Sequence, residues 1–512
     1  MKTSCNNNAM RKILLTFAVL SAAFAATAQC WNIESDRKGC LFGTCCNADN
    51  ETILVGRYDK DSFSAHATAF AIKIDEDGSY TTFQADDDTR SRFAEVIALD
   101  DGGYFVVGNR GEGVDERLWV LKFDEDLEVV SEHFYDKDAE FAELEFYYML
   151  MTKDDDGTFL VTGSVSPEIG FSRGFFYRLN ADGECLNSRY IHPDDYNGLF
   201  NNSGYRPDCI REMHECSDFL VIGAGQGGNP SFLRFDYDFN LVSTNIINDL
   251  PNPNHGSVNE EVTLLTFLYS DYWIDSTNLL ISGYACEDTN DDWFADKMYM
   301  FFGKADINAN IYETVFVANQ DTLHSTIQCH NMSVANDTTI YIVTVANVGS
   351  YLGPSLVDIY LANKDLELLG RLLPDNISVG YRPVTAVATK DGGIVVAENK
   401  FGYDGMRIRK FLREDFRSIL SVSEESDLLH ECLVYPNPAI DAVHIDVSGL
   451  DVGDGRTILR VFDILGRQCF NRTINGDGTV LTLDISFLES GTYSFQIIKD
   501  EDILISDKFI KH

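Results

Sequence analysis

A short segment recurs along residues 40–420 and decides which folds the chain can adopt. The sequence Asp-Asp-Gly-Gly-Tyr-Phe-Val-Val-Gly at 100–108 returns as Asp-Asp-Gly-Thr-Phe-Leu-Val-Thr-Gly at 155–163 and as Lys-Asp-Gly-Gly-Ile-Val-Val-Ala at 390–397. Looser copies end at residues 56, 223, 283 and 345. Successive copies end 52 to 62 residues apart, and a repeat of this length indicates a solenoid, a propeller or another repeat array.

Each copy is followed by a second apolar run that ends in a polar turn, as in 70–75, 118–124 and 407–412. The runs are short, rich in β-branched and aromatic residues, and bounded by turns such as Asp-Gly, so they predict strands and hairpins. Further strands fit before the Asp-Gly turn, as at 93–99, and after the second run, as at 127–130. Four antiparallel strands per unit predict the blade of a β-propeller, in which radial closure protects the sheet edges.

The repeat region resembles secreted bacterial propellers whose blades carry an Asp-Gly-Gly-Tyr-x-Val-x-Gly hairpin. We therefore expect an all-β protein with a seven-bladed β-propeller over residues 29–418. Six or eight blades are alternatives, because the fifth and sixth copies diverge most. Glycines such as Gly102 and Gly157 fit the positive φ of tight turns, and we expect Gly108 and Gly163 to let neighbouring blades approach closely.

The pattern changes after the repeats. Residues 419–433 lose the alternation of strands and gain charge, which predicts a linker. From residue 434 to 512 apolar residues alternate with a period of two, as in Val443, Ile445 and Val447, so this segment predicts a small Ig-like β-sandwich.

Four blocks of this C-terminal segment match a known family. They are Tyr-Pro-Asn-Pro at 435–438, Leu-Arg-Val-Phe-Asp-Ile-Leu-Gly-Arg at 459–467, Leu-Glu-Ser-Gly-Thr-Tyr at 488–493 and Lys-Phe-Ile-Lys at 508–511. The segment resembles the type A sorting domains of the Bacteroidota type IX secretion system. The motif residues are Pro436, Asn437, Pro438, Gly466, Gly491, Tyr493 and Lys508.

This resemblance implies export through both membranes, with the type IX machinery and its surface sortase as partners. In the family the sortase usually removes the domain and joins the cargo to surface polysaccharide. An Ig-like spacer or binding module that stays attached is the alternative. Fold alone would not distinguish the two.

The N-terminus carries the pattern of a signal peptide over residues 1–28. Arg11-Lys12 precedes the apolar run 13–26, and Ala-Thr-Ala at 26–28 offers the small residues of a cleavage site. No later run is long and apolar enough for a transmembrane helix, so we expect none in the mature chain. Export would place the eleven cysteines beyond residue 28 where disulfides persist, although their spacing does not reveal a connectivity.

Composition and motifs restrict the chemistry. With 81 acidic against 40 basic residues the net charge is −41, which argues against nucleic acid as a partner. No His-Glu-x-x-His, Gly-x-Ser-x-Gly or phosphate-binding loop is present. We expect no cofactor apart from structural calcium, for which Asp288, Asn290 and Asp292 supply a density of oxygen ligands without the pattern of an EF-hand.

Aromatic residues on loops are the candidates for binding, because tyrosine and tryptophan present a large apolar face with a polar group. The candidates are Trp273, Trp293, Tyr196 and Tyr205, although packing between blades is an alternative use for each. The primary hypothesis is a non-enzymatic, surface-displayed propeller that binds a glycan or protein partner through its loops. The alternatives are a secreted hydrolase or lyase that acts on extracellular polymers in the propeller funnel, and a structural component of the surface layer.

Overall fold

The computed structural model divides the chain into two compact units, residues 1–420 and 421–512. Most of the described residues lie in β-strands. The structure describes residues 30–59, 67–86, 89–166, 172–192, 195–199, 205–213, 218–224, 230–247, 268–287, 297–316, 323–326, 331–336, 338–347, 355–374, 381–400, 404–418, 434–447, 457–462, 468–474, 480–499 and 502–512. The predicted signal peptide and the predicted linker 419–433 lie outside these residues.

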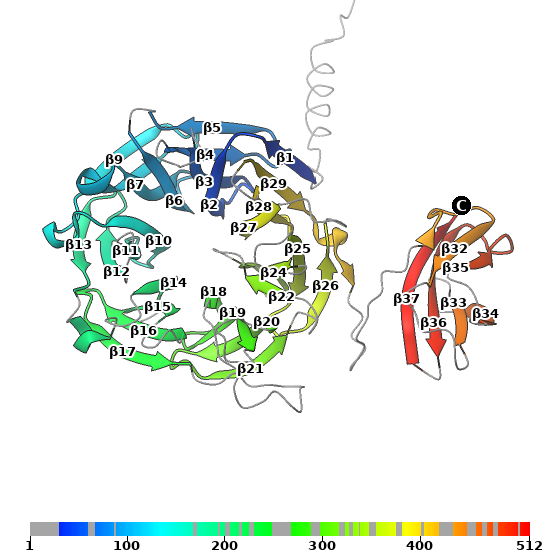
Figure 1. Ribbon diagram of the computed structural model, residues 1–512. Coiled ribbons are helices and arrows are strands. Elements are labelled where there is room, and N and C mark those ends of the chain that lie inside the picture. Colours follow the sequence, from blue (N-terminus) through cyan, green and yellow to red (C-terminus); the bar gives the residue numbers. More distant parts are fainter. Residues whose placement is uncertain are drawn as a thin grey trace, which may run out of the picture. The chain divides into compact units, whose positions relative to one another are not determined.

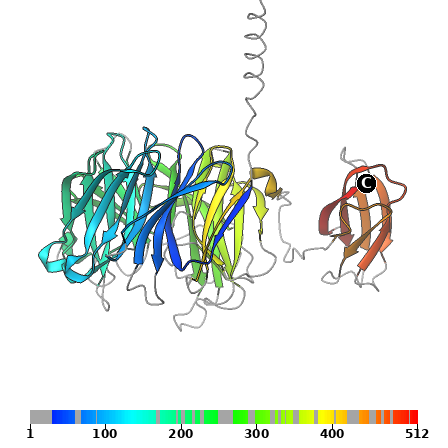
Figure 2. The same ribbon diagram turned by 90° about the horizontal axis from the view of Figure 1, so that it is seen from above.

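The first unit consists of separate antiparallel sheets arranged in a ring (Figures 1 and 2). In order along the chain, the strands of the first three sheets are β2 (Gly39–Cys46), β3 (Thr52–Asp59), β4 (Ala67–Ile74) and β5 (Tyr80–Gln84); β6 (Ser91–Ala98), β7 (Tyr104–Arg110), β8 (Arg117–Phe123) and β9 (Val129–Tyr135); β10 (Glu145–Lys153), β11 (Phe159–Ser166), β12 (Arg173–Leu179) and β13 (Cys185–Tyr190). Each sheet pairs its strands in sequence order, which is the expected meander of hairpins.

The next two sheets repeat this order. They contain β14 (Arg206–Glu212), β15 (Asp218–Ala224), β16 (Pro230–Asp236) and β17 (Leu241–Ile246), then β18 (Leu268–Trp273), β19 (Asn278–Glu287), β20 (Lys297–Asp306) and β21 (Ile311–Phe316). The following sheet is less regular and contains β22 (Leu323–Thr326), β23 (Met332–Asn336), β24 (Thr339–Asn347), β25 (Ser355–Ala362), β26 (Leu368–Leu372) and β30 (Arg417–Ser418).

The last sheet joins the two ends of the repeat region. Its strands β27 (Tyr381–Ala388), β28 (Ile394–Lys400) and β29 (Met406–Phe411) are completed by β1 (Trp31–Ser35), which pairs antiparallel with β29. The N-terminal strand therefore supplies the outer strand of the last sheet. The sequence analysis assigned no strand to this segment.

Hydrophobic clusters between neighbouring sheets hold the ring together. One cluster packs Phe105 and Val107 of β7 against Met149 of β10 and Phe159 of β11. The Phe105 and Phe159 rings stack in parallel with their centroids 4.1 Å apart. Because each sheet buries both faces in this way, the second and third strands read as nearly continuous apolar runs.

The second unit has two sheets that enclose one hydrophobic cluster. The first sheet contains β31 (Val434–Tyr435), β32 (Ala442–Asp446) and β35 (Val480–Asp484), and the second contains β33 (Thr457–Phe462), β34 (Gln468–Ile474), β36 (Gly491–Lys499) and β37 (Asp502–Lys511). Val443, Ile445 and Leu483 of the first sheet pack with Phe495 and Ile497 of the second. The alternation in the sequence thus gives each sheet a buried apolar face.

Candidate functional site

The innermost strands of the ring, which we call the inner strands, share a break in register. A residue without a partner interrupts the pairing in β2, β6, β10, β14 and β27, at Phe42, Ala94, Tyr147, Asp208 and Val384 respectively. Such β-bulges bend a strand and re-aim a side chain, and they recur next to functional sites. The pairing with the outermost strand also shifts register in several sheets, as between β12 and β13, so the bulge of an inner strand matters for the side chain that it presents at the centre.

The last glycine of the repeat makes room for the bulged inner strand. A Cβ atom on Gly108 would lie 2.0 Å from the Arg92 carbonyl oxygen, and one on Gly163 would lie 2.0 Å from that of Tyr148. Both oxygens belong to the inner strand of the same sheet as the glycine. The expectation that Gly108 and Gly163 let neighbouring blades approach each other is therefore wrong, because the close contact is made within one sheet.

The bulge of β10 presents an aromatic pair. The side chain of Tyr147 is 56% exposed although its strand is the innermost of its sheet. The Tyr148 ring stands edge to face against it, with 4.4 Å between the centroids and 82° between the planes. Glu145, two residues before Tyr147, forms an ion pair of 3.2 Å with Arg90, which directly precedes β6.

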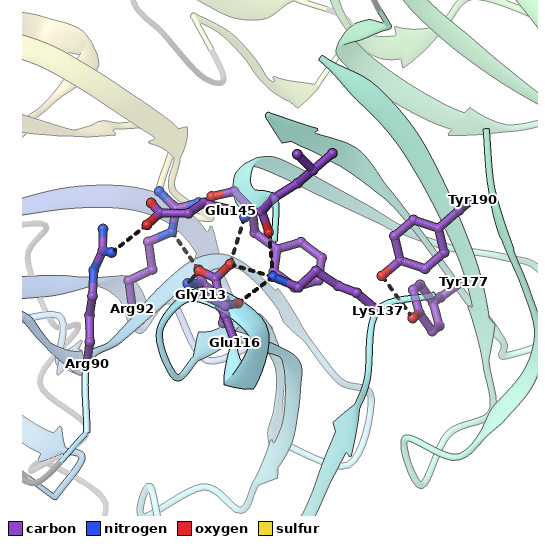
Figure 3. A network of polar contacts seen from close by, with 11 residues as sticks. Arg90, Arg92, Gly113, Glu116, Lys137, Glu145, Tyr177 and Tyr190 are labelled. Atoms are coloured by element: carbon purple, nitrogen blue, oxygen red, sulfur yellow. Dashed lines mark hydrogen bonds and ion pairs between the residues drawn. The ribbon is translucent and has the colours of Figure 1, made fainter. Parts of the chain in front are cut away.

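A buried network of polar groups holds the backbone of this bulge (Figure 3). Glu116, at the end of the short helix Gly113–Asp115, accepts a hydrogen bond of 2.9 Å from the Phe146 N–H. Arg92 of β6 donates to the Phe146 carbonyl at 2.6 Å and to the Tyr147 carbonyl at 2.9 Å. The N–H of Phe146 and the carbonyls of Phe146 and Tyr147 thus all have charged partners. Hydrogen bonds to charged groups are stronger than those between neutral groups.

Lys137 completes the network between β9 and β10. Its ammonium lies 3.3 Å from the Glu116 carboxylate, and the two side chains are 1% and 2% exposed. It also donates to the carbonyls of Gly113, at 3.0 Å, and Leu144. Asn109 of β7 links the ends, because its carbonyl accepts from Arg92 at 2.6 Å and its amide donates to Glu116.

Burial dominates the electrostatics of these groups. It raises the pKa of Glu116, which the Phe146 N–H and Lys137 oppose only in part. Burial, followed by the charge of Arg57, lowers the pKa of Arg92 to about 10. Even so, Arg92 stays charged at neutral pH.

A second aromatic side chain stands at the bulge of β2. The Phe42 ring has the Arg57 and Arg92 guanidinium groups within 5.9 Å and 5.8 Å of its centroid, which is the range of a cation–π contact. Arg57 also pairs with Asp59 at 3.0 Å. Arg92 therefore connects the Phe42 ring with the backbone that carries Tyr147.

The predicted binding aromatics have different surroundings. Tyr205 is only 1% exposed and its hydroxyl lies 2.8 Å from Thr162, so a ligand at the surface cannot stack on it. Tyr196 is partly buried, has a φ of 53° and donates to the Phe239 carbonyl at 2.7 Å. Trp273 ends β18 and packs against the cluster around Leu279, whereas Trp293 lies outside the described residues.

The calcium candidates Asp288, Asn290 and Asp292 also lie outside the described residues. Within the described ranges, no three His, Cys, Asp or Glu side chains are grouped as metal ligands. In the part of the chain that the structure describes, Cys30, Cys40, Cys45, Cys46, Cys185 and Cys469 carry free thiols, and burial raises the pKa of Cys40 to about 12.

The sequence analysis missed Tyr147. The signal was the run Phe-Tyr-Tyr-Met at 146–149, in which the alternation of a strand is interrupted. A bulge of one residue moves the following side chains to the other face, so the sequence did not show which tyrosine would be exposed.

The structure brings two of the C-terminal motif blocks together. The Asn437 side chain accepts a hydrogen bond of 2.9 Å from the Ile510 N–H and donates to the Lys508 carbonyl at 3.4 Å. Pro436 and Pro438 flank this asparagine and are exposed. The Pro-Asn-Pro segment is therefore attached to the final strand.

Of the remaining motif residues, Tyr493 contacts the final strand β37, Gly491 begins the neighbouring strand β36, and Gly466 lies outside the described residues. Tyr493 stacks on Phe509 of β37 with 5.6 Å between the centroids and donates to the Glu489 carbonyl at 2.9 Å.

Comparisons with solved structures returned several proteins of low sequence identity. The extracellular domain of a one component system from B. thetaiotaomicron is 10% identical with a TM-score of 0.36, and the match covers 95% of this chain and 56% of that one. The chain thus spans just over half the length of that structure. An ulvan lyase of a new polysaccharide lyase family is 8% identical with a TM-score of 0.41, over 76% and 98% of the two chains.

The β-propeller domain of the trilobed protease from Pyrococcus furiosus is 9% identical with a TM-score of 0.38, over 76% of this chain and 100% of that one. The comparison with curated proteins found no match. Among the described residues, no helix has the length and apolar character needed to span a membrane.

The comparison with protein families gives a result for the second unit. Residues 433–512 match the family described as the secretion system C-terminal sorting domain. The match begins two residues before Tyr435 and includes the four sequence blocks described above. The C-terminal unit is a type IX sorting domain, which directs the protein across the outer membrane to the cell surface or the extracellular space.

Proposed function

We propose that the chain is a surface-displayed binding protein, in which a seven-bladed β-propeller binds a glycan or a protein partner. The observation that carries this proposal is Tyr147, a large aromatic side chain that is 56% exposed on an inner strand. Exposed aromatic residues are common binding anchors, because they supply a large contact area at a low cost in side-chain entropy. A buried network holds the backbone beneath Tyr147, which is the rigid support that a binding residue needs.

The delivery of this propeller follows from its ends. In the proposal, residues 1–28 are a signal peptide, 419–433 are a linker, and 434–512 form an Ig-like sandwich of the type A sorting class. The surface sortase removes that sandwich, so the working protein extends from residue 29 to about 430. The contacts of Asn437 with the final strand support a compact unit that can be detached whole.

Export is tested by deletion of residues 434–512 in a Bacteroidota host, with the protein followed by cell fractionation and surface proteolysis. The full chain is expected at the surface and the truncated chain in the periplasm. The control is Asn437→Ala, which keeps the whole domain but removes the contacts with the final strand. A truncated chain that still reached the surface would contradict the delivery proposal.

Binding is tested with the mature chain on arrays of immobilised polysaccharides and of extracellular proteins. Retention of the chain on at least one polymer, without change of that polymer, is expected. The same polymers are assayed for shorter products or new unsaturated ends. Release of such products would replace the binding proposal by a hydrolase or lyase, and no retention on either array would refute it.

A further inference from the structure

The aromatic pair Tyr147 and Tyr148 lies on an inner strand of the ring. Both residues belong to β10, the innermost strand of its sheet, which borders the centre of the ring (Figure 1), and the Tyr147 side chain is 56% exposed. Exposed tyrosines of the rim, such as Tyr80 of β5 and Tyr312 of β21, lie on outermost strands instead. Tyr147 therefore differs from the exposed tyrosines of the rim in its place on an inner strand.

The geometry of the pair suits a sugar. The Tyr147 ring is 56% exposed, and the Tyr148 ring meets it edge to face, so the pair offers one ring face backed by a second ring. The C–H face of a pyranose packs on such a ring, and a phenolic hydroxyl can donate to or accept from the hydroxyl groups of a sugar. Glu145, two residues before Tyr147, is 52% exposed and forms an ion pair with Arg90, so a charged group lies close to the pair in the sequence of the strand.

Hydrogen bonds with charged side chains hold the backbone that carries the pair. Arg92 donates to both carbonyls of the bulge, and Glu116 accepts from its Phe146 N–H. Lys137 neutralises Glu116 at 3.3 Å in a buried environment. A ring that is already held in place pays less ordering entropy when a ligand binds.

We propose that Tyr147 and Tyr148 form a carbohydrate-binding platform at the centre of the ring, with Arg92 as the residue that positions it. The proposal rests on the proposed binding function and assigns its ligand class and its site. The ligand is a polysaccharide chain, one sugar of which stacks on Tyr147. Arg92 acts through the backbone of the bulge and makes no contact with the sugar.

The test uses the mature chain and soluble xylan, mixed-linkage glucan, galacturonan and alginate as probes, with affinity measured by titration calorimetry and affinity electrophoresis. At least one probe is expected to bind, and Tyr147→Ala is expected to weaken that binding by about tenfold or more. The matched control is Tyr312→Ala, which removes a tyrosine that is 51% exposed on the outermost strand β21 and should leave the affinity unchanged.

The role of Arg92 is tested by a double-mutant cycle. Arg92→Lys should weaken the affinity in the parent chain but have a much smaller further effect in the Tyr147→Ala background, because Arg92 contributes mainly by holding the backbone that carries Tyr147. An equal loss in both backgrounds would show a general structural role instead. Circular dichroism at each titration temperature confirms that the variants compared are folded.

The outcomes separate the platform from the broader binding proposal. If a probe bound equally well to the parent chain and to Tyr147→Ala, the chain would still be a glycan-binding protein but the platform would be refuted. If no polysaccharide bound while an extracellular protein did, the sugar assignment would fail and the binding function would stand.

Discussion

Glu116, in the connection between β7 and β8, accepts a hydrogen bond of 2.9 Å from the backbone N–H of Phe146 on the inner strand of the next sheet. This bond crosses from one sheet to its neighbour and ends beside the bulge that carries Tyr147. The position of an exposed side chain thus depends on a buried carboxylate, and that carboxylate depends on Lys137 for its counter-charge.

We expect that truncating one member of the Glu116–Lys137 pair destabilises the first unit strongly. Glu116→Ala leaves the Lys137 ammonium buried without its carboxylate, which costs about 3–5 kcal/mol in the free energy of unfolding. The double variant Glu116→Gln/Lys137→Met removes both charges and should be more stable than Glu116→Ala. Urea denaturation followed by tryptophan fluorescence measures these differences.

The pH dependence of Lys137→Met adds an independent check. Without the ammonium, burial raises the pKa of Glu116 in the folded state further above its value in the unfolded chain. The folded state then binds a proton more readily, so stability increases as the pH falls toward that raised pKa. The stability gap between the parent chain and Lys137→Met should therefore narrow from pH 7 to pH 5, and a constant gap would contradict the assignment.

The repeat glycine and the turn glycine are expected to differ in their tolerance of alanine. A Cβ on Gly108 would lie 2.0 Å from the Arg92 carbonyl oxygen, so the bulged inner strand must move. Gly157 has a φ of 82° and nothing within 4 Å of its Cβ position, so alanine there meets only backbone strain of about 1–2 kcal/mol. Gly108→Ala should lower the thermal midpoint more than Gly157→Ala does, and the reverse order would show that the bulge is free to relax.

We expect the stability of the first unit at acid pH to depend on Asp391, because the side chain of this hairpin-turn aspartate is largely buried. Asp391 pairs with Lys410 at 2.5 Å, and their side chains are 13% and 1% exposed. Burial would raise the pKa of Asp391, but the bonds from Lys410, Thr389 and the Gly393 N–H hold it below its ordinary value. Since the folded pKa is depressed, this stabilisation is present above the unfolded pKa of about 3.9 and is lost as the pH falls through the folded pKa.

Asp391→Asn should therefore lower the urea midpoint at pH 7 and have less effect near pH 3. The control is Asp101→Asn, at the same place in the repeat but with a side chain that is 57% exposed beside Lys122. Its effect at pH 7 should be the smaller of the two, because solvent screens an exposed ion pair. Equal effects would show that burial does not determine the contribution of this pair.

The sequence predicted the repeated strands because their residues are local and periodic. The runs at 118–124 and 407–412 lie almost entirely within β8 and β29, and Gly102 and Gly392 adopt the positive φ that their turns require. The closure by β1 was missed, since pairing of Trp31 with Lys410 joins residues from opposite ends of the repeat region and leaves no local pattern.

Local sequence patterns could not predict the candidate site either. Arg92, Glu116 and Lys137 come from three different segments, and only the packing of two sheets brings their side chains together. The acidic turns, by contrast, contain a pattern that the sequence does show. Asp236 accepts from the N–H groups of Asp238 and Asn240, and Asp306 accepts in the same way from Asn308 and Asn310.

The same turn geometry recurs at Asn363, whose side chain accepts from the N–H groups of Asp365 and Glu367, and Leu366, the fourth residue of that turn, leads to the last prediction. Leu366 has a φ of 64°, in the left-handed region that costs a residue with a Cβ about 1–2 kcal/mol, yet its side chain is 3% exposed. Burial of the leucine offsets this strain. Leu366→Ala loses about 2–5 kcal/mol of packing and keeps the strain, whereas Leu366→Gly loses slightly more packing and relieves it.

Leu366→Gly should thus be at least as stable as Leu366→Ala in urea denaturation. The matched control is Leu361, which is 4% exposed on β25 of the same sheet and has no positive φ. There the order should reverse, because glycine in a strand adds backbone entropy to the unfolded chain without relieving any strain. If alanine were the more stable substitution at both positions, the left-handed conformation at Leu366 would have no measurable cost. Burial of the leucine would then have no backbone strain to offset.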